Sequence, residues 1–228
     1  MNRDFKLLVF DWDGTLMDSE ARILSCVRAA AHDLGLETPA DPAIRNIIGL
    51  GLGEAVLMLF PWLERSGVVA VIDRYRHHYL HADETPSELF PGSLGVLREL
   101  ESRDYLLAVA TGKGRQGLQK VLNSTRLESL FHATRCADET FSKPHPQMLL
   151  EILDELGVEA DEALMIGDTE YDLEMAGNAG VRSVAVGYGA HEPERLAGHG
   201  PLTILEDIAD LIGWLDEGEY TNRPPLTG

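Results

Sequence analysis

This sequence has few cysteines, no long apolar run and little positive charge. Its 228 residues include two cysteines, Cys26 and Cys136, which are distant in the chain and form no C-x-x-C pair. That pattern is typical of reduced thiols in a cytoplasmic protein and excludes a disulfide-rich secreted scaffold. No apolar run reaches the roughly 18 residues of a membrane-spanning helix, so the sequence predicts no membrane span.

Positive charge is scarce as well. The chain has 19 lysines and arginines against 38 aspartates and glutamates, a formal net charge of -19. Such an acidic surface argues against nucleic acid or an anionic membrane as the main partner. It does not exclude a phosphorylated small molecule, because a metal ion and a few local cations can reverse the field within one cleft. Hydrophobic residues make up 44% of the chain, which is enough for a folded core.

Short apolar segments alternate with amphipathic helical patterns along most of the chain. Met148, Leu149, Ile152 and Leu153 show the helical spacing, and Gly157 follows as an expected C-cap. Continuous apolar strands separated by helices predict a doubly wound, Rossmann-like parallel sheet in an α/β core, with ligands bound at the carboxyl ends of the strands. The expected strands are Leu7–Phe10, Tyr105–Ala110, Phe131–Cys136, Ala163–Ile166, Ser183–Val186 and Leu202–Leu205.

The segment between the first two expected strands is too long for a simple crossover. Residues 18–87 show helical patterns throughout, beginning with a stripe of Ile23, Val27 and Ala30. We therefore expect an inserted all-helical cap domain at 18–87 and an α/β core formed by 1–17 and 88–228. The last stretch, 218–228, is polar and contains proline and glycine, which predicts a frayed tail.

The segment KLLVFDWDGTLMDSE, residues 6–20, places Asp11 and Asp13 directly after the first expected strand. Like charges this close repel each other and resist desolvation, so we expect a cation between them. Trp12 should point to the opposite side of the extended chain and serve packing. The simpler alternative is that Asp11, Asp13 and Gly14 only form a turn.

Other polar groups follow the remaining strands and should meet the two aspartates at the same edge of the sheet. Clustered carboxylates suit Mg²⁺, while a hydroxyl, backbone N–H groups and a lysine suit phosphate oxygens. An aspartate can attack phosphorus, and a second carboxyl group can protonate the leaving oxygen. These groups are Thr111, Gly112 and Lys113 after the second strand, Lys143 before Pro144, and Asp168, Glu170 and Asp172 after the fourth long strand.

Two further groups have simpler interpretations. His77, His78 and His81 are a conceivable metal site, but their spacing is more typical of a polar helix face. Glu170 is a minor metal-site candidate, because an acidic residue in the first turn of a helix also interacts favourably with the helix dipole.

Four segments, in this order, resemble the motifs of the haloacid dehalogenase superfamily, in its phosphatase branch with a helical cap. They are DWDGTLMDS, VATG, KPHP and GDTEYDLEMAGNAG, which begin at residues 11, 109, 143 and 167. The resemblance extends from residue 5 to about residue 190 and is closest to the phosphoglycolate phosphatase-like group. Each motif alone is weak, but four in the right order and context are specific.

The resemblance implies a role for each matching residue. Asp11 is the expected nucleophile and a Mg²⁺ ligand, and Asp13 is the expected acid/base, with its backbone carbonyl on the metal. Dehalogenases of the superfamily lack this second aspartate, so it indicates phosphate esters as substrates. The remaining implied roles are phosphoryl binding by Thr111 and the N–H of Gly112, charge neutralisation by Lys143, metal ligation by Asp168 and metal support by Asp172.

The cap is where the resemblance implies substrate selection. Residues 45–56, RNIIGLGLGEAV, resemble the specificity loop of the family, with Gly49, Leu50 and Gly51 as candidate substrate contacts. The glycines could instead simply break a helix. The loop has no cation, whereas sugar-phosphate mutases of this family usually carry an arginine there. Arg45, one turn earlier, is a further candidate.

These features predict a cytoplasmic, Mg²⁺-dependent phosphatase that acts on a small phosphorylated metabolite, with phosphoglycolate as the first substrate to test. We expect an aspartyl-phosphate intermediate and a monomer or homodimer. Two alternatives remain open at this point. One is a hexose-phosphate mutase that uses the same two aspartates, and the other is a non-catalytic binding module on the same fold.

Overall fold

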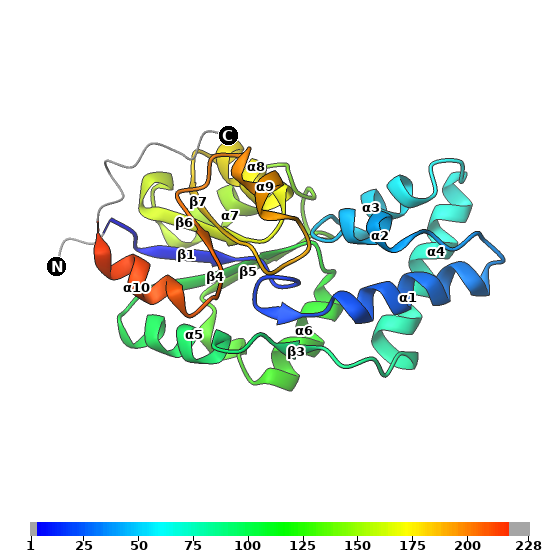
Figure 1. Ribbon diagram of the computed structural model, residues 1–228, viewed down its shortest axis with the longest axis horizontal. Coiled ribbons are helices and arrows are strands. Elements are labelled where there is room, and N and C mark those ends of the chain that lie inside the picture. The colour runs from blue at the N-terminus through cyan, green and yellow to red at the C-terminus, as the bar shows by residue number, and fades with distance from the viewer. Residues whose placement is uncertain (1–3, 219–228) are drawn as a thin grey trace.

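The computed structural model describes residues 4–218, so the predicted frayed tail lies outside the described residues from 219 onward. Six parallel strands form the central sheet in the order β5-β4-β1-β6-β7-β8 (Figure 1). Each expected strand is present, with its ends shifted by at most two residues, because continuous apolar runs bury both faces of a parallel strand. The strands are β1 (Leu7–Phe10), β4 (Leu106–Thr111), β5 (Ala133–Cys136), β6 (Ala163–Gly167), β7 (Arg182–Val186) and β8 (Ile204–Leu205).

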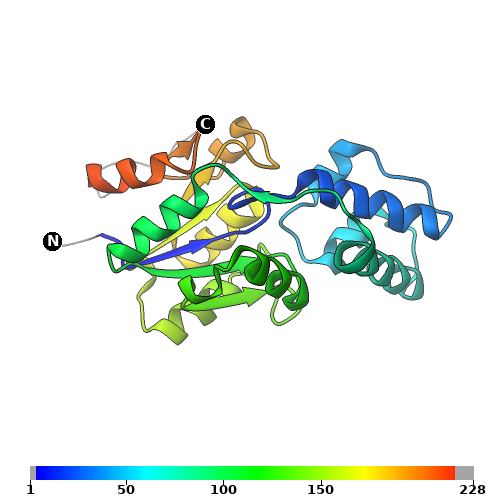
Figure 2. The same cartoon turned by 90° about the horizontal axis from the view of Figure 1, so that it is seen from below.

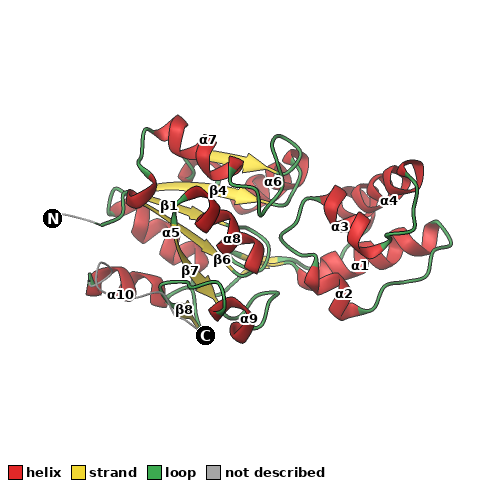
Figure 3. Cartoon of the chain, turned by 90° about the horizontal axis from the view of Figure 1, so that it is seen from above, coloured by secondary structure: helices red, strands yellow, loops and turns green. Residues whose placement is uncertain are grey.

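Helices cover both faces of this sheet (Figure 3). Leu8 and Phe10 of β1 belong to the apolar cluster on one face, and Leu7 and Val9 belong to the cluster on the other. Helices α5 (Ser93–Ser102), α6 (Arg115–Thr125) and α10 (Asp210–Glu217) pack on the first face, and α7 (Gln147–Leu156) and α8 (Glu170–Ala179) on the second. The short elements η2 (Glu128–Leu130), η3 (Ala160–Glu162) and α9 (Pro193–Ala197) complete this part.

Helix α7 shows how the sequence pattern produces this packing. Its apolar residues Met148, Leu149, Ile152 and Leu153 are all buried against the sheet. Gly157 ends the helix in the left-handed conformation, with φ 63°, which confirms the predicted C-cap.

A second group of helices lies beyond the carboxyl ends of the strands, apart from the sheet (Figures 1 and 2). It has its own apolar clusters, which include Ile23, Val27 and Ile44 in one and Val56 and Phe60 in the other. It comprises α1 (Glu20–Asp33), α2 (Asp41–Asn46), α3 (Leu52–Leu59), α4 (Arg65–His77) and the π-helical turn η1 (His78–Ala82). A two-stranded antiparallel ribbon, β2 (Met17–Asp18) with β3 (Glu88–Leu89), leads into and out of this group, which we call the cap.

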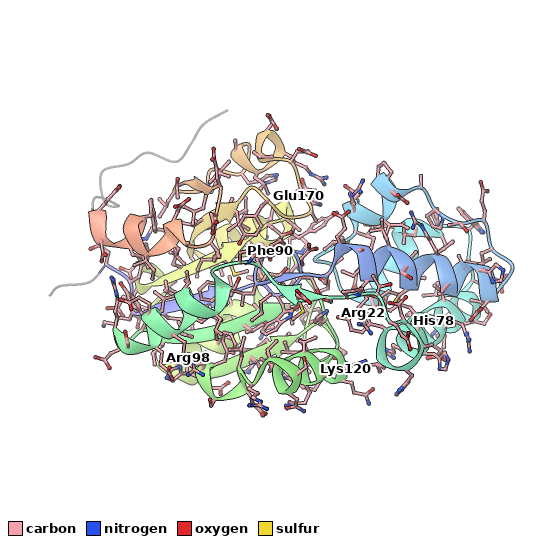
Figure 4. All side chains as sticks on the ribbon, turned by 60° about the horizontal axis from the view of Figure 1, so that its bottom comes forward. Arg22, His78, Phe90, Arg98, Lys120 and Glu170 are labelled. Carbon is pink, nitrogen blue, oxygen red and sulfur yellow. The ribbon has the colours of Figure 1, made fainter. Side chains whose placement is uncertain are left out.

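Several hydrogen bonds hold the cap against the strand ends. Lys120 of α6 donates to the backbone oxygen of Leu80 at 2.6 Å, and Tyr171 of α8 donates to that of Asn46 at 2.8 Å. Within the cap, Arg22 of α1, labelled with Lys120 in Figure 4, donates to the backbone oxygen of Tyr79 at 3.0 Å and joins α1 to η1. The cap therefore closes directly over the edge where the candidate residues gather. Among residues 4–218, no helix has both the length and the hydropathy needed to cross a membrane.

Candidate active site

The candidate residues meet because three neighbouring strands end at one edge of the sheet. Asp11 directly follows β1, Thr111 is the last residue of β4, and Asp168 directly follows β6. Strand β1 lies between β4 and β6, so these three side chains come from adjacent strand ends. This is the position at which parallel sheets bind ligands.

Asp11 is a buried carboxylate whose charged form is disfavoured by its surroundings. Its side chain is fully buried, and within the described part of the chain Oδ1 faces only the Lys143 ammonium while Oδ2 has no partner. Burial raises the pKa of Asp11 to about 7, although the Lys143 ammonium, 2.8 Å from Oδ1, opposes this rise. A buried carboxylate oxygen without a donor is costly, so the structure favours a cation or an electrophile at this position.

Asp168 lies beside Asp11 and is the second carboxylate of an acidic cluster. Its oxygens accept hydrogen bonds from Thr15 Oγ1 and from the backbone N–H of Ala190, both at 2.8 Å. Burial and the charge of Asp11 raise the pKa of Asp168 well above its usual value. The backbone at Gly14 approaches so closely that a Cβ there would overlap the Asp168 carboxylate, which explains the glycine.

Asp11, Asp168 and Asp172 offer oxygen atoms that all lie within 4.8 Å of one another. With the Lys143 ammonium, three ionised carboxylates leave an excess of two negative charges in a buried site. Hard divalent cations such as Mg²⁺ bind oxygen ligands of this kind. The unpartnered Oδ2 of Asp11 and the net charge of the cluster therefore fit a divalent cation.

Asp172 differs from its two neighbours, because its oxygens already have donors. One accepts from Lys143 Nζ at 2.6 Å, and the other accepts from the backbone N–H and the hydroxyl of Thr169. Thr169 and Asp172 form a capping box at the start of α8. The sequence predicted metal support by Asp172, and this geometry is compatible with support through Lys143.

Lys143 is buried between two aspartates. Its ammonium lies 2.8 Å from Asp11 and 2.6 Å from Asp172. Burial alone would lower its pKa, but the charges of Asp11 and Asp172 raise the pKa overall. Lys143 is therefore a fixed positive charge beside the carboxylate that has no other donor.

Asp13 is not one of the three clustered carboxylates and has its own partners. Its Oδ1 accepts a hydrogen bond from the Ser19 hydroxyl and lies 2.7 Å from the Lys113 ammonium, with which it forms an ion pair. The same ammonium donates to the Tyr79 hydroxyl at 2.6 Å. Burial alone would lower the pKa of Lys113, but Asp13 and Tyr79 raise it overall. Trp12, between the two aspartates, is buried with its indole nitrogen 3.3 Å from Met17 Sδ, which confirms its packing role.

The phosphate-binding candidates lie where the cap meets the core. Thr111 is buried, and its hydroxyl accepts the backbone N–H of Lys113 at 3.2 Å. A Cβ at Gly112 would overlap the backbone carbonyls of Gly49 and Leu50, so this position requires glycine for the close approach of the cap loop. The N–H of Gly51 donates to Ser142 Oγ at 2.7 Å and fixes the same loop from the other side.

The cap candidates divide into two groups. Gly49, Leu50 and Gly51 line a cavity of about 720 Å³ that also reaches Asp11 and Asp13. Arg45 does not line this cavity. It is exposed and forms a 2.7 Å ion pair with Glu20.

The remaining candidates lie elsewhere. Glu170 pairs with Arg195 and His199 and takes no part in the acidic cluster (Figure 4). His78 bonds Asp33 at 2.8 Å, and the described residues contain no histidine metal cluster. The polar-face interpretation of the three histidines is the one that fits.

Sequence reasoning gave no role to Tyr79 or Thr15, and it counted Lys113 only among the polar groups at the strand ends. Lys113 carried a weak signal, since it follows Thr111 and Gly112 at a strand end. Tyr79 carried none, because its link to Lys113 joins residues that are 34 positions apart in the chain.

Three comparisons with known proteins agree with this geometry. Residues 8–186 match the family model described as haloacid dehalogenase-like hydrolase. A protein of Dickeya dadantii named probable phosphatase IndB is 34% identical over 212 residues, which cover 91% of this chain and 92% of that protein. A phosphoglycolate phosphatase of Rhodospirillum rubrum is 30% identical over 219 residues, covering 92% and 90%.

Solved structures show the same architecture. The crystal structure of a predicted phosphoglycolate phosphatase from Haemophilus somnus superposes with a TM-score of 0.86 at 25% identity, covering 94% of this chain and 99% of that one. A haloacid dehalogenase-like hydrolase structure from Bacteroides fragilis has a TM-score of 0.85 at 24% identity and supports the fold.

Proposed function

Because this chain belongs to the haloacid dehalogenase-like hydrolase family and is a phosphatase, we propose that it hydrolyses small phosphorylated metabolites through an aspartyl-phosphate on Asp11. One observation carries this proposal. Asp11 is buried beside a second aspartate at the end of β1, with Lys143 at one carboxylate oxygen and no described donor at the other. A nucleophile that attacks phosphorus needs such a free carboxylate oxygen.

In the first step, an Asp11 oxygen attacks the phosphorus of the substrate and forms a new P–O bond. The bond from phosphorus to the leaving oxygen breaks, and protonated Asp13 gives its proton to that oxygen. Lys143 balances charge on Asp11 and on the phosphoryl group, while Thr111 and the N–H of Gly112 bind phosphoryl oxygens. Free alcohol leaves, and Asp11 carries the phosphoryl group.

In the second step, water attacks the phosphorus of the aspartyl-phosphate and loses its proton to Asp13. The bond between phosphorus and Asp11 breaks and inorganic phosphate forms. Asp13 is a carboxylate once it has given up its proton in the first step, and Lys113, 2.7 Å away, would hold that carboxylate in position to accept this proton.

A divalent cation, which we propose to be Mg²⁺, would be held by Asp11, Asp168 and the backbone carbonyl of Asp13. When bound, it neutralises charge that develops on the phosphoryl oxygens. The cap, residues 18–87, would exclude bulk water while the phosphoryl group is transferred. The two cysteines are buried and free, which suits a reducing compartment such as the cytoplasm.

The experiment is to measure inorganic phosphate release from a panel of phosphate monoesters, with Mg²⁺ and with EDTA, for wild type and Asp11→Asn. Phosphoglycolate belongs in the panel because relatives of this chain bear its name. We expect release that both EDTA and the substitution abolish. If glucose 1-phosphate is isomerised while no ester is hydrolysed, the chain is a mutase instead, and if neither reaction occurs the catalytic proposal is wrong.

A further inference from the structure

The cavity above Asp11 is large and mainly apolar. Its volume of about 720 Å³ lies within the range, roughly 300–1,000 Å³, of pockets that hold drug-sized ligands. One end contains Asp11, Asp13 and Thr111, and the rest extends into the cap. A two-carbon acid ester such as phosphoglycolate would fill only a small part of this space.

The cap supplies most of the apolar lining, from three helices that surround the space. Val27 of α1, Val56 of α3 and Val71 of α4 are all buried and line it, and Leu50 of the cap loop lies between them and the strand ends. Apolar walls of this kind bind apolar groups, because the contact removes apolar surface from water.

The cations that line the cavity do not offer a ready site for a substrate carboxylate in the cap. Lys113 is engaged by Asp13 and Tyr79, and Arg115 by Glu139. Arg76 of α4 also lines the cavity, but its side chain is exposed, and an ion pair that stays in contact with water contributes little to binding. A negatively charged leaving group would therefore meet mainly apolar walls, at the desolvation cost of an unpaired charge.

We propose that the substrate of this site is a phosphate monoester of a bulky apolar alcohol, whose hydrocarbon body occupies the cap cavity while its phosphoryl group lies at Asp11. This inference rests on the proposed function and names its substrate class. The hydrocarbon passes Leu50 and lies among Val27, Val56 and Val71. The reaction is the hydrolysis described above, with the apolar alcohol as the group that leaves.

The test compares straight-chain alkyl phosphates from ethyl to octyl, below their micelle-forming concentrations, together with phosphoglycolate and acetyl phosphate. We expect kcat/KM to rise about two- to fourfold for each added methylene until the cavity is filled, in line with the gain per buried methylene. We also expect octyl phosphate to exceed phosphoglycolate by at least tenfold.

A pair of substitutions on α4 then locates the hydrocarbon. Val71→Phe adds bulk inside the cavity, and Val69→Phe is its matched control, because Val69 is on the same helix, 49% exposed, and does not line the cavity. We expect Val71→Phe to lower the ratio of kcat/KM for octyl phosphate to kcat/KM for ethyl phosphate at least tenfold. Val69→Phe should leave this ratio unchanged.

The outcomes separate this inference from the proposed function. If kcat/KM is flat or falls with chain length while phosphoglycolate is hydrolysed with Mg²⁺, the substrate class is wrong and the phosphatase mechanism stands. If neither the alkyl series, phosphoglycolate nor acetyl phosphate releases phosphate, both are wrong. Because the chain-length series uses the wild-type protein, a Val71→Phe variant that fails to fold leaves the test decisive.

Discussion

The two ends of the substrate cavity differ in almost every physical property. At the strand ends, Asp11, Asp168 and Lys143 are buried charged groups, each placed by a strand end or a fixed loop. In the cap, residues such as Val56 and Val71 present apolar surface without directional bonds. The difference separates two tasks, because chemistry needs polar atoms at fixed distances, whereas selection by an apolar wall depends on volume and shape.

The two regions also differ in how they tolerate change. At the strand ends, Gly14 and Gly112 leave no room for even a methyl group, because a carboxylate or a backbone carbonyl fills the space. In the cap the room varies along the loop, because Gly53 has nothing within 4 Å of the place where a Cβ would lie, whereas Gly49 and Gly51, next to the core, are crowded by Thr169 and Ser142. We therefore expect substitutions at the strand ends to affect turnover of every substrate, and substitutions in the cap to affect the choice among substrates.

The largest effect should come from removing the Asp11 carboxylate. Asp11→Asn keeps the side-chain shape but removes the proposed nucleophile, so we expect kcat to fall roughly 10⁴-fold or more for all substrates. Steady-state kinetics of phosphate release measures this. Asp18→Asn, an exposed aspartate in the same motif, is the matched control and should stay within twofold. Substantial activity in Asp11→Asn would contradict the covalent mechanism.

Asp168→Asn tests whether the acidic cluster holds the metal. It removes one charge beside Asp11 but keeps an oxygen for Thr15, so we expect kcat/KM to fall roughly 10²-fold, with a clear rise in the Mg²⁺ concentration needed for half-maximal rate. Magnesium titrations of activity for wild type and variant provide the comparison. An unchanged magnesium requirement would place the ion elsewhere.

Lys113 connects the two regions, since it bonds Asp13 in the core and Tyr79 in the cap. Lys113→Met removes the charge that positions Asp13, and we expect kcat to fall roughly tenfold, with a changed pH profile of kcat. Tyr79→Phe removes only the bond to the cap and should cost less. A loss in KM alone, without a change in kcat or its pH profile, would assign Lys113 to substrate binding instead.

The free energy of unfolding should depend on pH because Asp11 is buried, and this can be measured without any substrate. The pKa of Asp11 is about 7 in the folded protein, above the ordinary value of 3.8, so the folded state binds the proton more tightly than the unfolded state. The contribution of Asp11 to stability therefore decreases as the pH rises from about 4 to 7, by up to about 4 kcal/mol.

Thermal unfolding in EDTA across this pH range tests the sign. The asparagine of Asp11→Asn does not titrate, so the unfolding temperature of this variant should exceed that of wild type by an amount that grows as the pH rises. This difference should shrink when Mg²⁺ is added. A difference that is constant with pH would show that burial does not raise the pKa of Asp11.

The smallest effect is expected at Arg45. The sequence made it a candidate substrate contact, but it is exposed, pairs with Glu20 and lies outside the cavity lining. We expect Arg45→Ala to change kcat/KM by less than twofold for every ester in the panel. A larger loss would bring Arg45 into the substrate site and reopen the mutase alternative.

The sequence predicted the six strands and α7 well because their signals are local. An apolar run such as Leu7–Phe10, or the spacing of Met148 and Ile152, reports which face of an element is buried. Strand ends shifted by one or two residues, because turn geometry and hydrogen bonding set the last paired residue. The gathering of the four motifs at one site could also be predicted, because it requires only that parallel strands end at the same edge of the sheet.

The sequence by itself determined which chemical groups follow each strand, and hence that carboxylates, a lysine and a threonine gather at one edge of the sheet. Only the tertiary structure decided which hydrogen-bond and ion-pair partners each of these groups has. Asp11 faces only the Lys143 ammonium whereas Asp172 has several donors, Lys113 joins Asp13 to Tyr79, and the cap lines a mainly apolar cavity. The physical reason is that burial, hydrogen-bond partners and cavity shape depend on packing between segments distant in the chain, and local spacing does not encode that packing.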